Sequence, residues 1–404
     1  MDNTDEFNAG NITREHLDNK GTIIQPFKAI HIHTDKKFLR DSVKFISDYF
    51  ENKVFLISYD REVENTHNQN ITIVKPNPKS FKRIVDICNE ADLVVLYGLD
   101  NLKARIALKL SENVKIAWRF FGFELYSIDS DLYFSERTRQ VLKTNAKEKT
   151  VSFLKNIIRK TGSFIKWGVY PNNSFNKAIK RMDLFLGLME EEYDMLSKRW
   201  NDLPPFIRIP IKFPFKLEDE IHKKKNHIII GNNRSSYNNL LDVMDIIEQN
   251  RNKEEYKFLV LFNYGNESKY SKEVRQMVSN RDHYELITDF LSMDKFKQLY
   301  RHTSAAVFNG YRQMAMGNIF YAINYGVKVY LNDNNSVKDW LINNGIKVFS
   351  VDDFYADIFN NTIALTYKEI ENNYEKLHRL INSYTYENFQ LFVYKFLAYE
   401  HYET

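Results

Sequence analysis

Short apolar runs of four to six residues recur along this chain and alternate with segments of helical periodicity. In the first half of the sequence such runs lie at 29–32, 54–57, 71–74, 93–97 and 114–118. Strands that are buried on both faces carry this pattern, because a parallel sheet is covered by helices on each side. The sequence therefore predicts an α/β fold that is built on parallel sheets.

The alternation occurs twice, and a proline-rich stretch around 204–214 separates the two series. At 404 residues the chain is also too long for one ordinary core. We therefore expect two Rossmann-like domains that face each other across a cleft, with a long C-terminal helix over 367–402. The predicted boundaries are a disordered polar tail over 1–26, a first domain over 27–203, a linker over 204–226, a second domain over 227–360 and C-terminal helices over 361–404.

The composition excludes several classes of protein. The 57 Lys and Arg residues outnumber the 53 Asp and Glu residues by a formal charge of only +4, so we expect no nucleic-acid partner. The single Cys88 rules out an internal disulfide and a cysteine metal cluster, and makes a cytoplasmic location the default. A run of ~18 apolar residues, the length that spans a membrane, is absent from the sequence. The polar, acidic start predicts no secretion signal.

The stretch 308–331 organises the second series, since it holds a strand end, a polar turn, a helix and the next strand. Where the strand passes to the helix N-terminus stand Arg312, Gln313, Gly317 and Asn318. Free backbone N–H groups and the helix dipole favour an anion there, and a guanidinium suits a phosphate ester. The alternative is that Gly317 only permits close packing and that Arg312 is a surface charge.

A second polar turn follows the apolar run at 227–230 and precedes a helix expected at 240–249. A strand, a glycine, small polar residues and a helix can cradle a phosphate, although this is not a Walker motif. Tyr264 lies in a similar turn after the run at 258–262. The candidate binding residues of the second turn are Gly231, Asn232, Asn233, Ser235 and Asn238.

Three polar turns of the first series fall at the carboxyl ends of predicted strands, where parallel sheets bind ligands. The side chains of interest in them are His33, Asp35 and Glu124. Glu124 stands beside a glycine in an aromatic stretch, so burial would raise its pKa toward that of a useful base. The alternatives are an ion pair with Arg119 for Glu124, a loop role for His33 and a helix N-cap for Asp35.

The segment 141–167 is strongly basic. As a helix, residues 151–166 would place an apolar stripe opposite a basic face, which is the pattern of an interfacial helix on an anionic membrane surface. The alternative is an ordinary surface helix whose apolar stripe packs on the sheet. The residues expected to face the membrane are Lys155, Ile158, Arg159, Lys160 and Trp167.

Three segments of the second series, 231–239, 261–265 and 311–319, together resemble a known family. They are similar to the TDP-N-acetylfucosamine:lipid II N-acetylfucosaminyltransferases, which are bacterial glycosyltransferases of the GT-B fold. In the first series the resemblance rests on 29–32, 97–99 and 122–126, and the last of these, Gly-Phe-Glu-Leu-Tyr, is similar to a G-x-[DE]-L-Y turn of that family.

The resemblance implies transfer of a 4-acetamido-4,6-dideoxyhexose from a dTDP- or other nucleotide-diphosphate sugar. The second domain would hold this donor, with Arg312 balancing the leaving-group charge, and neither a metal nor another cofactor would be needed. The first domain would hold a polyprenyl-diphosphate-linked sugar or another surface-glycan acceptor. Glu124, before Asp35 and His33, would deprotonate the acceptor hydroxyl.

This interpretation predicts a cytoplasmic protein that is peripherally associated with the inner membrane and acts in the synthesis of a surface polysaccharide similar to enterobacterial common antigen. Two other functions also fit the sequence. One is a nucleotide-sugar epimerase of the same fold, which would not need the basic segment. The other is a non-catalytic sugar-binding assembly protein.

Overall fold

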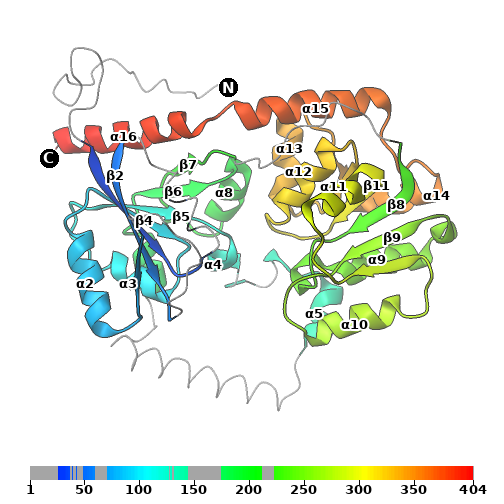
Figure 1. Ribbon diagram of the computed structural model, residues 1–404, viewed down its shortest axis with the longest axis horizontal. Coiled ribbons are helices and arrows are strands. Elements are labelled where there is room, and N and C mark those ends of the chain that lie inside the picture. Colours follow the sequence, from blue (N-terminus) through cyan, green and yellow to red (C-terminus); the bar gives the residue numbers. More distant parts are fainter. Residues whose placement is uncertain are drawn as a thin grey trace.

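The computed structural model describes residues 26–36, 39, 42, 49–59, 71–126, 128–129, 132–143, 174–211 and 223–403. These residues form two parallel sheets with helices on both faces, set side by side along the long axis of the molecule (Figure 1). The prediction of an α/β fold with two Rossmann-like domains is confirmed. Within the described chain, none of the helices has the length and apolar character needed to cross a membrane.

The first sheet has seven parallel strands in the order β3-β2-β1-β4-β5-β6-β7. Val94 faces the core on one side of this sheet and Val95 the core on the other, which explains the uninterrupted apolar run of β4. The strands are β1 Phe27–His33, β2 Phe50–Ile57, β3 Ile71–Val74, β4 Leu93–Tyr97, β5 Lys115–Arg119, β6 Leu184–Gly187 and β7 Phe206–Arg208. The helices around it include α2 Pro78–Cys88, α3 Asn101–Ala107, α4 Phe123–Tyr126, α7 Ser174–Ile179 and α8 Glu190–Ser197.

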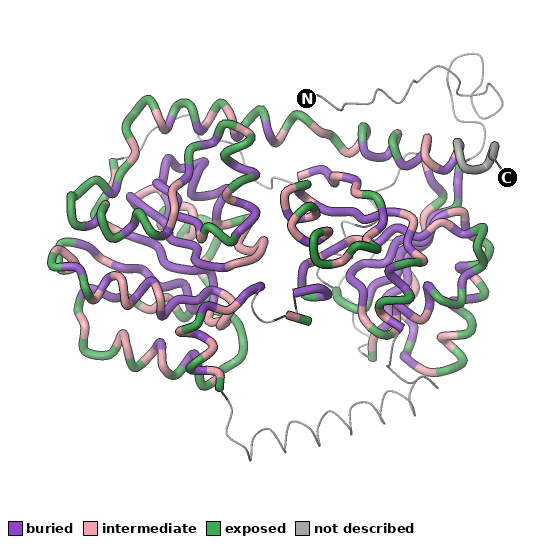
Figure 2. The backbone as a smooth tube through the Cα atoms, turned by 180° about the vertical axis from the view of Figure 1, so that it is seen from behind, coloured by how far each residue is buried: buried purple, intermediate pink, exposed green. Residues whose placement is uncertain are grey.

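The second sheet has six parallel strands in the order β10-β9-β8-β11-β12-β13. Buried residues are concentrated in the two sheets, and exposed residues lie mostly on the surrounding helices (Figure 2). The strands are β8 Lys225–Ile230, β9 Lys257–Leu261, β10 Tyr284–Ile287, β11 Thr303–Phe308, β12 Lys328–Leu331 and β13 Phe349–Ser350. The helices are α9 Leu240–Gln249, α10 Lys269–Val278, α11 Met293–His302, α12 Met316–Asn324, α13 Ser336–Asn343 and α14 Phe354–Phe359.

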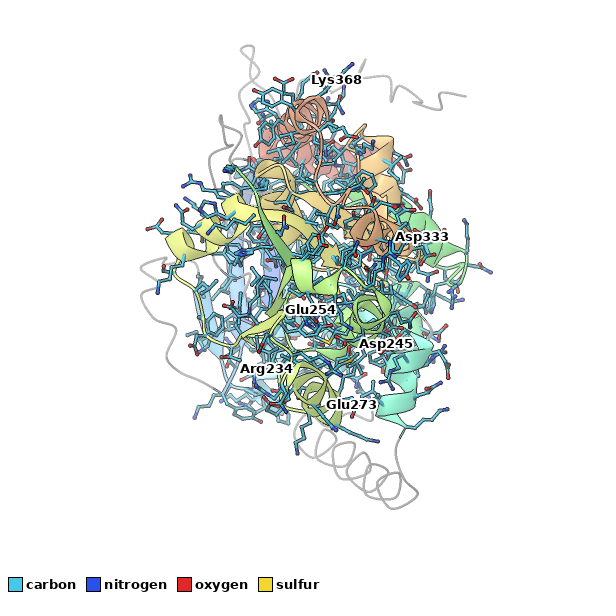
Figure 3. All side chains as sticks on the ribbon, turned by 90° about the vertical axis from the view of Figure 1, so that its right-hand side faces the viewer. Arg234, Asp245, Glu254, Glu273, Asp333 and Lys368 are labelled. Carbon is cyan, nitrogen blue, oxygen red and sulfur yellow. The ribbon has the colours of Figure 1, made fainter. Side chains whose placement is uncertain are left out.

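Charged side chains of both signs are spread over the second domain. Figure 3 looks onto this domain and labels Arg234, Asp245, Glu254, Glu273, Asp333 and Lys368. Such mixing agrees with the small formal charge of +4 for the whole chain.

The helical C-terminus expected over 367–402 is present, but it is interrupted once and forms α15 Tyr367–Asn382 and α16 Tyr386–Glu403. The two helices pack on different domains. Leu377 of α15 lies in a core of the second domain, whereas Leu397 of α16 lies in a core of the first. The chain therefore returns to the first domain after completing the second, as Figure 1 shows.

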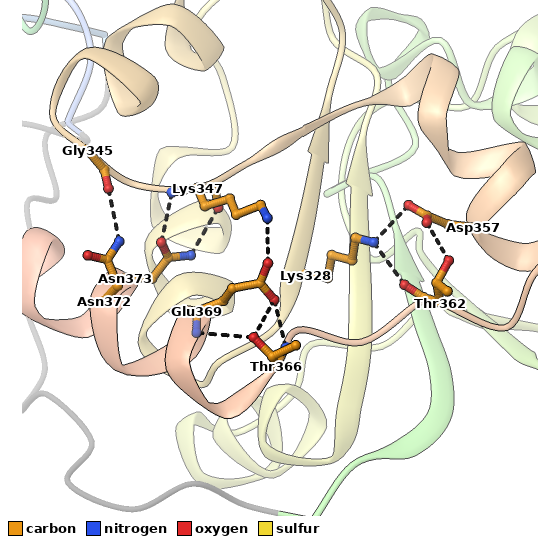
Figure 4. Close-up of polar contacts among 9 residues, drawn as sticks. All are labelled: Lys328, Gly345, Lys347, Asp357, Thr362, Thr366, Glu369, Asn372 and Asn373. Carbon is orange, nitrogen blue, oxygen red and sulfur yellow. Dashed lines mark hydrogen bonds and ion pairs between the residues drawn. The ribbon is translucent and has the colours of Figure 1, made fainter.

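Polar contacts fix α15 to the second domain (Figure 4). The Asn373 side chain accepts from the Lys347 N–H at 2.7 Å and donates to the Lys347 carbonyl at 3.0 Å. The Lys347 ammonium also pairs with Glu369 in the first turn of the helix. Thr366 and Glu369 form a capping box, which satisfies N–H groups at the helix start.

One segment of the predicted first domain packs on the second. This crossing segment, 132–143, contains α5 Glu136–Leu142. Val141 joins an apolar core of the second domain. The Ser135 hydroxyl donates to Asp242 of α9 at 2.7 Å. The two domains are therefore tied together by the chain at this point, as well as by α16 and the linker.

Several sequence predictions fall on residues outside the described ranges. They are most of the predicted tail 1–26, the central part of the linker 204–226, and nearly all of the basic segment 141–167, including the five residues expected to face a membrane. These remain predictions.

The docking of α16 can be tested by one substitution. Leu397 is fully buried against the first sheet, so Leu397→Ala should lower the free energy of unfolding by about 2–5 kcal/mol. Phe392 lies on the same helix but is 44% exposed, and Phe392→Ala should change stability by only about 0.5 kcal/mol. Urea unfolding followed by tryptophan fluorescence measures both. A Leu397→Ala protein as stable as the wild type would show that α16 does not pack here.

Candidate functional site

The two turns predicted to bind an anion lie side by side at the carboxyl edge of the second sheet. Their strands, β8 and β11, are neighbours in which Ile230 pairs with Val307. The Gly231 N–H donates to the Val307 carbonyl at 2.9 Å. The strand order of the sheet reverses between these two strands. Doubly wound sheets bind ligands at such a reversal, so these turns form the donor-side candidate site.

The turn after β8 is held together by its own polar groups. Gly231 has a φ of +65°, and a Cβ at this position would lie 2.4 Å from a Leu240 methyl group, so only glycine fits. The Asn233 side-chain oxygen accepts from the Ser235 N–H and from the Asn238 amide, both at 2.8 Å. Three predicted binding residues, Asn233, Ser235 and Asn238, thus use these groups to shape the turn.

Asn232 has a different environment from its neighbours. It is 6% exposed, yet its Oδ1 atom has no hydrogen-bond partner within the described chain. Its Nδ2 atom lies 3.4 Å from the Tyr264 hydroxyl. A buried polar atom left unpaired costs about 1–3 kcal/mol, so this amide oxygen marks a place where a donor group of a ligand would be stabilised.

Two exposed aromatic side chains lie beside this amide. Tyr264 is 43% exposed and Phe290 is 79% exposed. Their rings are nearly parallel, at 17°, with centroids 6.3 Å apart. Tyr264 was predicted from the sequence and Phe290 was missed. The signal for Phe290 is an aromatic residue in the turn that directly follows a strand, β10.

The start of α12 is open. Gly317 is exposed, and a Cβ built there meets no atom of the described chain within 4 Å. The alternative in which Gly317 permits close packing is therefore wrong. Ala315 occupies the N-cap position, so within the described residues no side chain caps the helix. Asn318 is held by the Tyr300 hydroxyl, which donates to its Oδ1 atom at 2.7 Å.

A reciprocal pair of asparagines sets the spacing of the two donor-side turns. The Asn239 amide donates to the Asn309 carbonyl at 3.2 Å, and the Asn309 amide donates to the Asn239 carbonyl at 3.0 Å. Asn239 also donates to the Tyr133 carbonyl at 3.1 Å and accepts from the Ser135 N–H at 3.0 Å. The crossing segment therefore joins the same network. Neither asparagine was singled out in the sequence.

In the first sheet the strand order reverses between β1 and β4. There, His33 and Tyr97 stack with ring centroids 3.9 Å apart. Burial, followed by the proximity of His31 and Lys103, lowers the pKa of His33 to about 2. Its Nε2 atom has no hydrogen-bond partner among the residues that the structure describes. An imidazole of such low pKa is a weak base, so His33 suits a hydrogen-bonding role better.

Asp35 lies beside a polar connection between the turns after β1 and β4. The buried Lys103 ammonium donates to Thr34 and to Asp100, each at 2.6 Å. Asp100 in turn caps α3 through the N–H groups of Leu102 and Lys103. Asp35 itself is exposed. Of the three predicted bases, Asp35 is the one that is exposed to solvent, whereas His33 and Glu124 are buried.

Glu124 lies in an enclosed position. It is 3% exposed, and its Oε1 atom accepts from the Leu99 N–H at 3.1 Å and the Trp118 indole at 3.2 Å. The Phe121 N–H lies 3.3 Å from both carboxylate oxygens. Burial raises the pKa of Glu124, as expected. The carboxylate also ties the turn after β5 to the turn after β4.

Arg312 lies between the two domains, so the surface-charge alternative is wrong. Its guanidinium carbon is 4.9 Å from the centre of the Tyr237 ring in the second domain and 5.7 Å from that of Tyr126 in the first. Gly122, with a φ of +93°, makes room for it, because a Cβ there would lie 2.8 Å from Arg312 Nη1. The Nε atom of Arg312 is buried and finds no partner in the described ranges.

The remaining predicted residue of this turn, Gln313, is half-buried beside Arg312. As for metals, the described residues contain no cluster of three or more His, Cys, Asp or Glu side chains that could hold an ion.

The second domain matches a known sequence family. Residues 203–375 match the model of a family described as 4-alpha-L-fucosyltransferase, glycosyl transferase group 56. This range includes both donor-side turns and the asparagine pair that joins them. No curated protein matches the chain.

Solved structures resemble the whole chain. Alr3699/HepE of Anabaena, in complex with UDP and glucose, has a TM-score of 0.58 at 11% identity, with 92% of this chain and 99% of that chain covered. The lipopolysaccharide outer core galactosyltransferase WaaB has a TM-score of 0.56 at 11% identity, with 91% and 99% covered. An alpha-glucosyltransferase in complex with UDP and a DNA 13-mer has a TM-score of 0.52 at 11% identity, with 93% and 100% covered.

At such low identity these structures show the fold alone, which is the GT-B glycosyltransferase architecture. These proteins include a lipopolysaccharide outer core galactosyltransferase and an alpha-glucosyltransferase in complex with DNA, so the shared fold does not define an acceptor. The fold and the family match in the second domain together support a glycosyltransferase function.

Proposed function

We propose that this protein is a glycosyltransferase that moves a deoxyhexose from a nucleotide-diphosphate sugar to a surface-glycan acceptor. The observation that carries the proposal is the pair of neighbouring turns at the strand reversal of the second domain, within the range that matches a fucosyltransferase family. Fucose is a 6-deoxyhexose, so the family description and the resemblance to acetamidodideoxyhexosyl transfer agree on the class of sugar.

The donor would lie across the two turns of the second domain. Its diphosphate would accept hydrogen bonds from the uncapped N–H groups at the start of α12, where the helix dipole also favours negative charge. The exposed rings of Tyr264 and Phe290 offer a planar apolar surface for the nucleobase. The buried and unpaired Asn232 oxygen would accept from a base or ribose donor group. UDP in the complexes of HepE and the alpha-glucosyltransferase agrees with a nucleotide donor.

In the transfer, the bond from the sugar C1 to the diphosphate oxygen breaks and a bond from C1 to the acceptor oxygen forms. The nucleoside diphosphate leaves with the electron pair, and Arg312 is the cation placed to balance its charge. The acceptor hydroxyl gives its proton to a base on the first domain. Because Glu124 is enclosed by N–H groups, we assign this role to Asp35, which is exposed at the end of β1.

The acceptor is proposed to be a sugar on a polyprenyl diphosphate in the inner membrane. Support comes from the sequence alone, through the basic and apolar residues of 141–167.

The donor site can be tested through Gly317→Ala. Alanine is the better helix former by up to about 1 kcal/mol, so the variant should be at least as stable as the wild type. Its methyl group would occupy the open space at the start of α12, and we expect affinity for a nucleoside diphosphate to fall about tenfold. Calorimetry with UDP, dTDP and GDP measures the effect. Lys368→Ala, in the exposed first turn of α15, is the control and should bind normally. A wild-type protein that binds none of the three would contradict the donor proposal.

The base can be identified by comparing Asp35→Asn with Glu124→Gln. We expect Asp35→Asn to lower turnover by about 100-fold or more while donor affinity is kept, because an amide cannot accept the proton of the acceptor hydroxyl. Glu124→Gln should act mainly on thermal stability. Turnover is read as nucleoside diphosphate release with a polyprenyl-diphosphate-linked sugar as acceptor. Asp86→Asn, an exposed substitution on α2, serves as control. Normal turnover of Asp35→Asn would remove this residue from the mechanism.

The membrane proposal predicts binding to vesicles that contain phosphatidylglycerol but not to pure phosphatidylcholine. Replacing Lys155, Arg159 and Lys160 together by Glu should abolish sedimentation with the anionic vesicles. The matched control reverses three exposed charges of α2, Lys79, Lys82 and Arg83, and should still sediment. Persistent binding of the first triple variant would count against an interfacial role for 141–167.

A further inference from the structure

Tyr126 connects the two domains through a chain of hydrogen bonds. Its hydroxyl donates to Glu192 Oε1 at 2.9 Å, and the Gln313 N–H donates to the same hydroxyl. Tyr126 is 1% exposed and Glu192 is 3% exposed. Glu192 belongs to the first turn of α8 and Gln313 to the turn that precedes α12. A carboxylate of the first domain therefore holds, through one tyrosine, a peptide of the donor-side turn.

The peptide held in this way is adjacent to Arg312. The Tyr126 ring forms one wall of the space that the guanidinium occupies, and Tyr237 forms the other. Because Glu192 and Gln313 both bind the Tyr126 hydroxyl, they also fix the orientation of the Tyr126 ring. Arg312 and Glu192 also interact electrostatically at longer range. The position of the cation in the donor site is therefore partly determined by a first-domain carboxylate.

Several charged or titratable groups of the described residues act on Glu192. Those that face it are Arg312 from the donor-side turn, Arg119 at the end of β5, and Glu124 of α4, together with the hydroxyl of Tyr126. Burial raises the pKa of Glu192 to about 7, against the opposing effects of the Tyr126 hydrogen bond and of Arg312. Its charge therefore changes within the physiological pH range.

We propose that Glu192 is a positioning residue which acts through Tyr126 to place Arg312 for the donor diphosphate, and that its ionised form is the one that favours donor binding. This inference rests on the proposed function. The ionised carboxylate accepts a charge-assisted hydrogen bond from Tyr126 and attracts Arg312. The protonated carboxyl loses the attraction and holds Tyr126 less strongly. Donor affinity should thus fall as the pH is lowered through about 7.

The contribution of Glu192 to the stability of the fold should have the opposite pH dependence to that of donor affinity. The pKa of Glu192 in the folded protein lies above the ordinary value of 4.5, so the folded state binds the proton more tightly than the unfolded state. Its contribution to stability is complete below pH 4.5 and is lost as the pH rises through about 7. A loss of binding at low pH therefore cannot be ascribed to unfolding of this site.

The test compares Glu192→Gln with the wild type from pH 5.5 to 8.5, using calorimetric binding of UDP, dTDP and inorganic pyrophosphate. Glutamine resembles the protonated carboxyl, so the variant should bind about tenfold more weakly than the wild type at pH 8.5. The two proteins should bind equally at pH 5.5. The phosphate groups of the probes also titrate. Taking the ratio of the two affinities at each pH cancels this effect, because it is the same for both proteins.

Two further variants separate positioning from a general structural effect. Tyr126→Phe keeps the ring but removes the hydroxyl, so it should bind weakly at every pH and show a smaller pH step. Glu190→Gln makes the same chemical change in the same helix turn at an exposed position, and should show the wild-type profile. Thermal unfolding at each pH confirms that the variants are folded.

The outcomes distinguish this inference from the proposed function. If the wild type binds a probe and Glu192→Gln shows the same affinity at every pH, Glu192 has no positioning role and the donor proposal stands. If the wild type binds none of the three probes, the donor proposal fails and this inference fails with it.

Discussion

The parallel direction of every strand in both sheets determines where this protein can bind a ligand. Parallel strands all end at the same edge of a sheet. Where the strand order reverses, the turns that follow the two central strands are separated, and a ligand can bind between them. In the second sheet these strands are β8 and β11, and in the first they are β1 and β4. The turns predicted from Gly231, Gly317, His33 and Asp35 all lie at these reversals. The arrangement follows from topology, before any individual side chain is considered.

The sequence predicted those features that depend on neighbouring residues. Apolar runs predicted the strands, and the glycine and polar residues after Ile230 predicted a turn. The structure adds that there is no room for a side chain at Gly231. Features that depend on distant residues were not predicted. Asn239 and Asn309, which brace the donor-side turns, are 70 residues apart, and nothing in either local sequence indicates the partner.

Glu124 shows that burial, which raises the pKa of a carboxyl group, can also surround that group with hydrogen-bond donors. Its aromatic neighbours indicated burial, and burial does raise its pKa. The same burial brought the Leu99 N–H and the Trp118 indole onto its oxygens. A carboxylate that is enclosed by N–H donors is poorly placed to meet a substrate. Local sequence shows that a residue is buried, whereas its hydrogen-bond partners depend on strands that are distant in sequence.

The contact between the domains at the proposed site includes polar and aromatic groups. Arg312 lies between two tyrosine rings with an unpaired Nε atom in the described structure, and Tyr126 is held by one carboxylate and one peptide N–H. Hydrogen bonds of this kind contribute only about 1 kcal/mol each. A bound diphosphate that pairs with Arg312 would add interaction energy of similar size to this arrangement. A ligand shifts a conformational equilibrium by no more than its differential affinity for the two states. A weakly held polar contact is one that such a ligand can strengthen, and so donor binding and the position of the first domain would be coupled.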